Sequence, residues 1–424
     1  MKKILIFVLV AALCLALVSC GGESEENKQQ VTENVGDVTV DTTVETLEET
    51  KDDTIEETTE NTAEETVAEA EKEPENNVIE HKIEVDNLRA RIVDYMRSMS
   101  AVEWTPNETF NLNGDHNTWG VDLNFKKGQT YYGLPYTRAF SGLEDFTVHI
   151  ENGVYKGPCG DYNTMPGNNC SSSCDMSWRR YLISDTEATY TYVPGFGNKT
   201  ISPVGDYTYP TGNRDTYKII EQNDQQKLFE SYALLQPADA IVKWSDARSA
   251  GHARMVAENA VVVRNAAGKI NAGRSYIVVI EQTNKLTTVN GKQSTWLVDH
   301  KYSFTELMND GYIPVTPKAL AEETELKITY TDPNTAENII TSLSGTLELS
   351  TSVKTVNMTV SDENGNVVKE FAVQVEPGTT KINLRKYTFN LDIGKLPEGK
   401  YNYKLEVVTP ASGTIELLDL DFEK

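Results

Sequence analysis

Three side chains in the middle of the chain have the types that nucleophilic acyl transfer requires: Cys170, His252 and Glu281. A thiol is a poor nucleophile until it loses its proton, and a place in the first turn of a helix would lower the pKa of Cys170 through the helix dipole. An imidazole such as His252 can hold the thiolate as an ion pair and later protonate the departing amine. We expect the strand Ser275–Ile280 to deliver Glu281 beside His252, where a carboxylate fixes the tautomer and favours the imidazolium.

Other polar side chains could take the orienting role of Glu281. Gln282 and Asn284 lie on the same segment and are the alternatives. The remaining histidines have no partner at the spacing of metal ligands, so we predict no metal site and no cofactor.

The elements around these residues mix helical and strand patterns. Leu88, Ile92, Val93 and Met96 recur at helical spacing within Ile83–Met99, which predicts a scaffold helix with one buried face. Five short motifs follow this segment in the chain. They are Tyr131–Tyr136, Asn168–Ser173, Leu235–Ile241, Gly251–Val256 and Val278–Asn284.

In this order the motifs resemble those of the NlpC-like and CHAP cysteine amidase/peptidase superfamily, over roughly Arg89 to Thr316. The family pattern has Gly-x-Pro-Tyr, Asp-Cys-Ser at a helix start, Pro-Gly-Asp before a strand, Gly-His-Val, and a polar residue on the next strand. Asn169 stands where the family usually has Asp, and Ala238 where it usually has Gly. Neither departure removes a catalytic group.

The resemblance implies a papain-like domain that cleaves amide bonds of cell-wall peptides. The backbone N–H of Cys170 would supply one donor of an oxyanion hole, and the Tyr136 hydroxyl would lie near the substrate as a second group. Tyr136 and Trp178 are candidate substrate contacts, and each could instead be part of the wall or the core.

Three cysteines follow the N-terminal region, and outside the cytoplasm thiols tend to pair. If Cys159 pairs with Cys174, a loop closes around the site and Cys170 stays free, as a nucleophile requires. If Cys170 is itself in a disulfide, the enzyme hypothesis fails or becomes redox-dependent. Cys170 and Cys174 are four residues apart on one helix face, a spacing that is awkward for a mutual bond.

The N-terminus predicts export and lipidation. Lys2 and Lys3 precede an apolar stretch from Ile4 to Val18, and the sequence Leu17-Val18-Ser19-Cys20 resembles a bacterial lipoprotein signal. We therefore expect a signal peptide over residues 1–20, a lipid on Cys20, and a protein held at the extracytoplasmic face of the cell membrane. The alternative is an uncleaved anchor helix, for which the apolar stretch is short.

Residues 21–80 predict an acidic disordered tether. They contain 21 Asp or Glu against 3 Lys and no aromatic residue, so they hold most of the formal net charge of −25. An acidic segment that binds a cation or a basic partner is the alternative. Nothing in the chain has the basic face of a nucleic-acid-binding protein.

We expect two folded domains of an α+β protein. Residues 81–320 would form the papain-like hydrolase domain, with an antiparallel sheet and N-terminal helices. Residues 325–424 have only strand patterns: Val356, Met358 and Val360 alternate with polar residues, as do the apolar residues of Tyr401–Val407. Their turn spacing favours an antiparallel sandwich that weakly resembles immunoglobulin-like accessory domains.

The hypothesis from these observations is a monomeric, surface-anchored cysteine hydrolase acting on peptidoglycan or another peptide substrate. A non-catalytic surface lipoprotein that binds a cell-wall or extracellular ligand is the alternative from another functional class. A transglutaminase-like cross-linker, which transfers the acyl group to an amine instead of water, is a third possibility.

Overall fold

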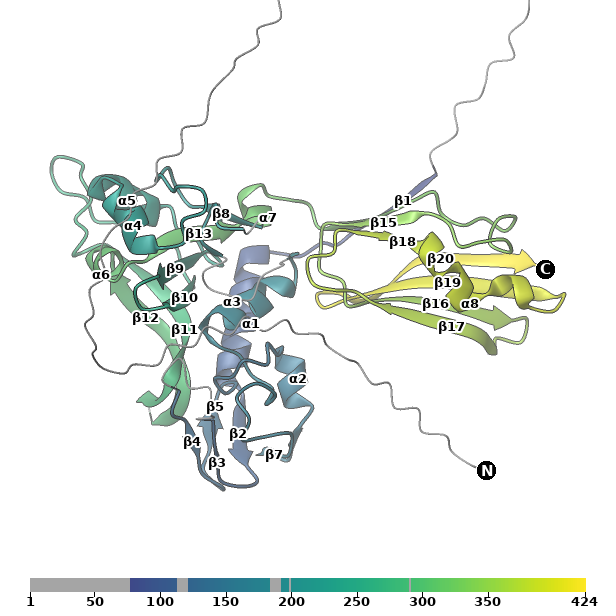
Figure 1. The fold of residues 1–424 in the computed structure, drawn as a ribbon, viewed down its shortest axis with the longest axis horizontal. Helices are drawn as coiled ribbons and strands as arrows, with labels where there is room; N and C mark the ends of the chain where they lie inside the picture. Colours follow the sequence, from purple (N-terminus) through teal and green to yellow (C-terminus); the bar gives the residue numbers. More distant parts are fainter. Residues whose placement is uncertain (1–76, 113–120, 184–191, 198–199, 290) are drawn as a thin grey trace, which may run out of the picture. The chain divides into compact units, whose positions relative to one another are not determined.

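The computed structural model describes residues 77–112, 121–183, 192–197, 200–289 and 291–424. The expected signal peptide (residues 1–20), the lipidated Cys20 and residues 21–76 of the expected tether lie outside the described residues. All described residues belong to one unit, Lys72–Lys424. Within them the protein is a mixed α/β structure with mostly strands, few helices and several sheets (Figure 1).

The largest sheet of the described residues has ten strands in the order β6-β7-β2-β5-β12-β11-β10-β9-β13-β8. Most neighbours are antiparallel, but β12 with β5 and β2 with β7 are parallel pairs. Its strands are β2 (Glu103–Pro106), β5 (Tyr131–Tyr132), β6 (Ile150–Glu151), β7 (Val154–Tyr155), β8 (Ile201–Pro203), β9 (Ala240–Ser245), β10 (Ala250–Val256), β11 (Tyr276–Val289), β12 (Lys292–Ser303) and β13 (Ile313–Pro317). A short pair, β3 (Phe110–Asn111) and β4 (Asn124–Phe125), lies outside this sheet.

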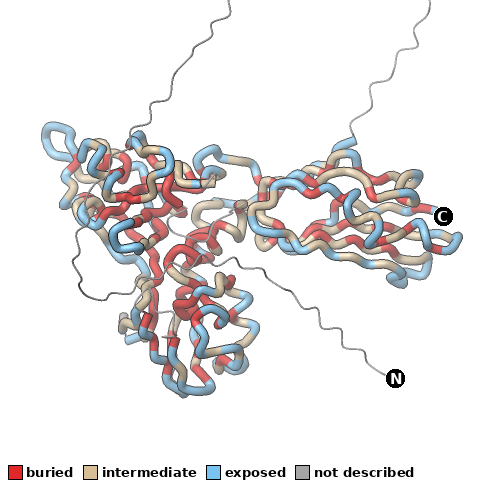
Figure 2. Tube along the Cα trace, in the orientation of Figure 1, coloured by how far each residue is buried: buried red, intermediate tan, exposed pale blue. Residues whose placement is uncertain are grey.

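Helices pack against the large sheet because each has an apolar side to bury. The helices before its last strand are α1 (Leu88–Ala101), α2 (Leu143–Thr147), α3 (Cys170–Arg179), α4 (Thr216–Glu221), α5 (Gln225–Ala233) and α6 (Phe304–Asn309), and α7 (Lys318–Ala321) follows it. The predicted scaffold helix is α1, which begins after Asn87 and buries Ile92, Val93 and Met96. Helix α3 packs against α1, β10 and β11. Figure 2 shows buried residues concentrated along these helices and the central strands.

The C-terminal part consists of two four-stranded antiparallel sheets, in the orders β1-β14-β15-β18 and β17-β16-β19-β20. The alternating residues of β16 and β19 are buried as their spacing predicts. Tyr330 of one sheet and Tyr403 of the other are both fully buried. The strands are β1 (Val78–Lys82), β14 (Lys327–Thr331), β15 (Thr346–Leu349), β16 (Thr355–Asp362), β17 (Val367–Gln374), β18 (Lys381–Asn383), β19 (Lys400–Thr409) and β20 (Gly413–Glu423), with helix α8 at Thr388–Leu391.

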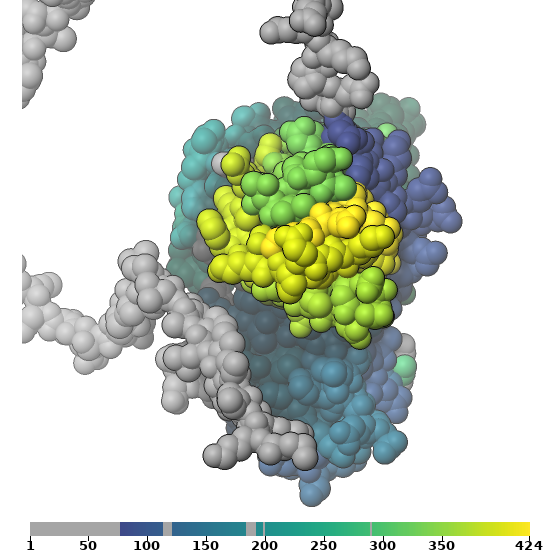
Figure 3. All heavy atoms as spheres, turned by 90° about the vertical axis from the view of Figure 1, so that its right-hand side faces the viewer, coloured from purple at the N-terminus to yellow at the C-terminus, as the bar shows by residue number. Residues whose placement is uncertain are grey.

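Strand β1 changes the expected domain boundaries. Val78–Lys82 pairs along its whole length with Lys327–Thr331, so the first described strand belongs to the C-terminal part. In Figure 3 the purple atoms of this strand lie beside the green and yellow atoms of the C-terminal strands. The segment that holds the large sheet is therefore an insertion between β1 and β14, and residues 78–80 form a strand instead of tether.

Candidate active site

The N-terminus of α3 holds the sulfur of Cys170. The helix begins at Cys170, and the Asn169 side chain caps it by accepting hydrogen bonds from the backbone N–H groups of Ser171 and Ser172, at 3.1 and 2.9 Å. The Ser172 hydroxyl in turn accepts from the Asn169 N–H at 2.7 Å, which completes a capping box. Asn169 thus caps the helix as well as an Asp would, but it brings no negative charge to the thiol.

His252 and Glu281 come from the neighbouring strands β10 and β11. Nε2 of His252 lies 2.6 Å from Oε2 of Glu281, and the imidazole also makes a hydrogen bond with Cys170. Because Nε2 is bonded to Glu281, Nδ1 is the ring nitrogen left for the sulfur. The structure therefore brings together all three residues that the sequence analysis singled out.

Opposing effects set the ionisation of Cys170 and His252. Burial raises the pKa of Cys170, but the charge of His252 and its hydrogen bond outweigh burial and bring the pKa down to about 7. Burial would lower the pKa of His252, but the charge of Cys170 and the hydrogen bonds to Cys170 and Glu281 raise it to about 9. The thiolate–imidazolium pair is thus the favoured state near neutral pH.

Two residues that the sequence analysis missed hold Glu281. Arg254 Nε donates to Oε2 of Glu281 at 2.9 Å, and the Tyr302 hydroxyl donates to Oε1 at 2.6 Å. Burial would raise the pKa of Glu281, which is 1% exposed, but the hydrogen bond and charge of His252 and then the charge of Arg254 lower it to about 2. The spacing of Arg254 could have identified it, because residues two apart on a strand lie on the same face of the sheet and Arg254 follows His252 by two. No pattern in the sequence points to Tyr302.

The hydrogen bonds of the His252 ring go to Glu281 and Cys170 and not to the alternative orienting residues. Gln282 is buried and donates from Nε2 to the carbonyl of Leu134 at 2.8 Å, which ties β11 to the segment before Tyr136. Asn284 lies three residues beyond Glu281 on β11. The bond between His252 and Glu281 leaves the orienting role with the carboxylate.

The Tyr136 hydroxyl lies beside the Cys170 sulfur. It donates to this sulfur at 3.9 Å, and the Tyr136 ring is stacked on that of Tyr162. Burial and the neighbouring Cys170 raise the pKa of Tyr136 well above its usual value, so the phenol remains a proton donor. Tyr136 can therefore donate to a charge that develops beside the sulfur.

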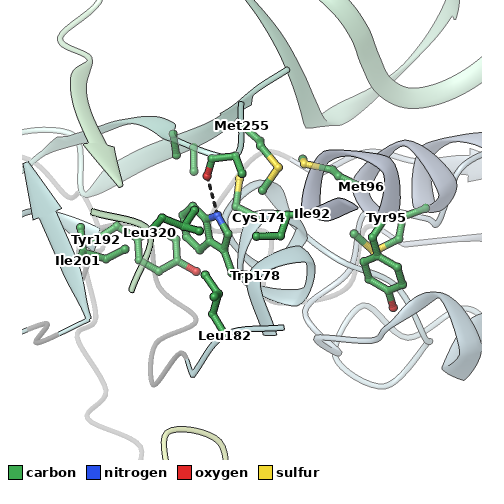
Figure 4. Close-up of a cluster of buried hydrophobic side chains, with 14 of the residues drawn as sticks. Ile92, Tyr95, Met96, Cys174, Trp178, Leu182, Tyr192, Ile201, Met255 and Leu320 are labelled. Carbon is green, nitrogen blue, oxygen red and sulfur yellow. Dashed lines mark hydrogen bonds between the residues drawn. The ribbon is translucent and has the colours of Figure 1, made fainter. Parts of the chain in front are cut away.

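Trp178 belongs to the core and not to a substrate surface, which corrects one of the two expected contacts. Its side chain is 1% exposed, and its indole N–H donates to the carbonyl of Ala238 at 2.8 Å (Figure 4). Ala238 has a φ of +68°, in the left-handed region where a Gly would be unstrained. The carbonyl bond from Trp178 and the Ala238 N–H bond to Val256 hold this strained turn in place.

The possible disulfide between Cys159 and Cys174 is not formed. None of the three described cysteines takes part in a disulfide. Cys159 donates to Glu108 at 3.0 Å, whereas Cys174 is buried in the core near Met255, as Figure 4 shows. Burial and Glu108 raise the pKa of Cys159 to about 11, and burial also raises that of Cys174. Cys170 is thus the one thiol of the three whose pKa is lowered.

Among the described residues, no group of three or more His, Cys, Asp or Glu side chains could hold a metal ion. No helix in the described part of the chain has the length and apolar character needed to cross a bilayer. A comparison of the chain with known protein families finds no match, and no curated protein matches it.

Proposed function

We propose that this protein is a cysteine hydrolase that cleaves amide bonds of cell-wall peptides. The observation that carries the proposal is the chain of contacts from Cys170 through His252 to Glu281, in which the thiol pKa is lowered and the imidazole pKa is raised. Perturbed pKa values of this kind, on a nucleophile, a base and its orienting group in contact, are typical of catalytic sites.

The proposed reaction is acyl transfer in two halves. The Cys170 thiolate attacks the amide carbonyl carbon, and the oxyanion that forms accepts hydrogen bonds from the Cys170 backbone N–H and the Tyr136 hydroxyl. Collapse of this intermediate breaks the C–N bond, while the His252 imidazolium gives its proton to the departing amine and a thioester remains. Neutral His252 then takes a proton from water, whose oxygen attacks the thioester and releases the acid and the thiolate.

The finer features of fold and location belong to the same proposal. The inserted domain would be papain-like and the two-sheet domain immunoglobulin-like. Residues 1–20 would be a lipoprotein signal, and a lipid on Cys20 would hold a monomer at the extracytoplasmic membrane face. Such a tethered enzyme would reach peptidoglycan through the acidic segment that follows Cys20.

The test is hydrolysis of purified peptidoglycan and of synthetic cell-wall peptides by the full chain and by Cys170→Ala. We expect Cys170→Ala to lower the rate by about 10³-fold or more, since loss of a catalytic nucleophile has effects of this size. Cys159→Ala is the matched control, because Cys159 is a free thiol bonded to Glu108, and should keep full activity. Equal activity in the unmodified chain and in Cys170→Ala would refute the mechanism.

Alkylation separates an enzyme from a non-catalytic binder of the same ligand. Iodoacetamide at neutral pH should modify Cys170 fast and selectively, because of the three described cysteines only Cys170 has a lowered pKa. Slow modification of Cys170 would favour the binding protein.

A further inference from the structure

Two positively charged side chains contact the ring of Tyr312, next to the proposed catalytic imidazole. The Arg254 guanidinium carbon lies 4.2 Å and the Lys243 Nζ 4.7 Å from the centre of this ring. The His252 ring meets it edge-on, with ring centres 6.4 Å apart. Tyr312 is buried just before β13, so its ring is a fixed support for all three.

Lys243 is the member of this group that faces solvent beside His252. The two residues are directly paired in the β9–β10 ladder, so their side chains stand on the same face of the sheet, with Cβ atoms about 5 Å apart. Lys243 is partly buried, and no carboxylate of the described residues lies within 4.0 Å of its Nζ. The ammonium group is thus held over the Tyr312 ring, on the residue paired with His252, with no ion-pair partner among the described residues.

The other charges near Lys243 are already engaged or lie further away. Burial lowers the pKa of Lys243, and the charges of Arg254 and Arg248 lower it further, while those of Asp310 and Glu281 oppose this. Glu281 is bonded to His252 and Arg254, and the Arg254 guanidinium lies over the ring of Tyr302 at 3.7 Å. Asp310 acts on Lys243 from beyond 4.0 Å, so among the described residues a carboxylate supplied from outside would be the first anion at ion-pair distance from Lys243.

We propose that Lys243 forms a carboxylate-binding subsite of the active site, supported by the positive field of Arg254, so that the preferred substrates are acidic peptides. This inference rests on the proposed function, since it names the substrate class of the same site. A partly desolvated ammonium gains more from a carboxylate than an exposed one does, because water screens the pair less. Lys243 is in this sense a specificity residue beside the Cys170–His252 pair.

Two alkylating reagents test the subsite without knowledge of the scissile bond. Iodoacetate and iodoacetamide both form a bond from sulfur to a CH2 carbon as iodide leaves, and they differ only in a carboxylate against a neutral amide. We expect Lys243→Met in the full chain to lower the ratio of iodoacetate to iodoacetamide rates at Cys170 by about fivefold at low salt. This difference should shrink as salt is added, because ions screen the charge.

Matched variants make the result specific. Lys243→Arg keeps the charge and should keep the ratio, whereas Lys369→Met removes one charge from β17 of the two-sheet domain and should leave the ratio unchanged. Lys243→Gln replaces Lys243→Met if circular dichroism shows that Met disturbs the sheet. An unchanged ratio in a folded neutral variant, with both reagents still fast, would overturn the subsite. Slow reaction of the unmodified chain with both reagents would instead refute the proposed function.

Peptide substrates give a second readout of the same inference. In paired peptides that differ only by Glu against Gln beside the cleaved bond, Lys243→Met should lower kcat/KM for the Glu peptide and leave that for the Gln peptide unchanged. Equal loss on both peptides would contradict a carboxylate subsite.

Discussion

The guanidinium of Arg254 donates from Nε to Oε2 of Glu281 at 2.9 Å, on the oxygen that also binds the proposed catalytic imidazole. His252 and then Arg254 keep this fully buried carboxylate ionised, and Arg254 also fixes the direction in which it meets His252. A buried anion that loses such a partner becomes costly and tends to take up a proton.

Arg254→Met should therefore move the acid limb of the pH profile, which the Cys170 pKa of about 7 sets in the unmodified chain, to higher pH. The depressed pKa of Glu281, about 2, means that its support of the imidazolium is lost only as pH falls through that value. Removal of the guanidinium raises this pKa, so the support is lost at a higher pH. The measurement is the rate of iodoacetamide reaction with Cys170 from pH 4 to pH 10. Arg254→Lys should restore part of the shift, and an unchanged acid limb in folded Arg254→Met would show that Arg254 has no such role.

The pH dependence of hydrolysis should be bell-shaped, with its maximum between about 7 and about 9. The thiolate forms as pH rises through the pKa of Cys170, and the imidazolium that protonates the leaving amine is lost as pH rises through the pKa of His252. His252→Asn should remove the interaction that lowers the thiol pKa and slow alkylation at pH 7 at least tenfold. Retention of fast alkylation in this variant would mean that the helix terminus alone ionises Cys170.

Ala238→Gly should stabilise the protein. Ala238 has a φ of +68°, and left-handed backbone costs a non-glycine residue about 1–2 kcal/mol. The greater freedom of Gly in the unfolded chain offsets part of this gain, which leaves a rise in the unfolding free energy of about 0.5–1 kcal/mol. Denaturant titration measures this change. Ala240→Gly, in the regular strand β9, is the control and should be destabilising, and a loss of stability in Ala238→Gly would contradict the strain argument.

Deletion of Val78–Lys82 should loosen the two-sheet domain and not the active site. This strand is paired with β14 over its whole length, although most of its side chains are exposed. Its contribution therefore comes mainly from backbone hydrogen bonds, each worth about 1 kcal/mol. Hydrogen exchange should become faster at the amides of Lys327–Thr331 that face β1, while Cys170 alkylation stays unchanged. Faster exchange together with slower alkylation of Cys170 would show that the inserted domain depends on β1.

The sequence by itself determined the residues that local rules can identify. Asn169 before Cys170 predicts a capped helix start, and the apolar alternation of β16 and β19 predicts strands with one buried face, because both signals act over a few neighbouring residues. Motif order also singled out His252 and Glu281, which the structure places in contact.

Only the tertiary structure decided which distant groups act on these residues. Tyr302 reaches Glu281 from another strand, Trp178 is enclosed in the core, and Cys159 and Cys174 remain separate thiols. Strand β1 joins a sheet whose other strands lie about 250 residues further along the chain. Contacts of this kind depend on sheet register and on packing between remote segments, and neither leaves a pattern in the local sequence that would predict it.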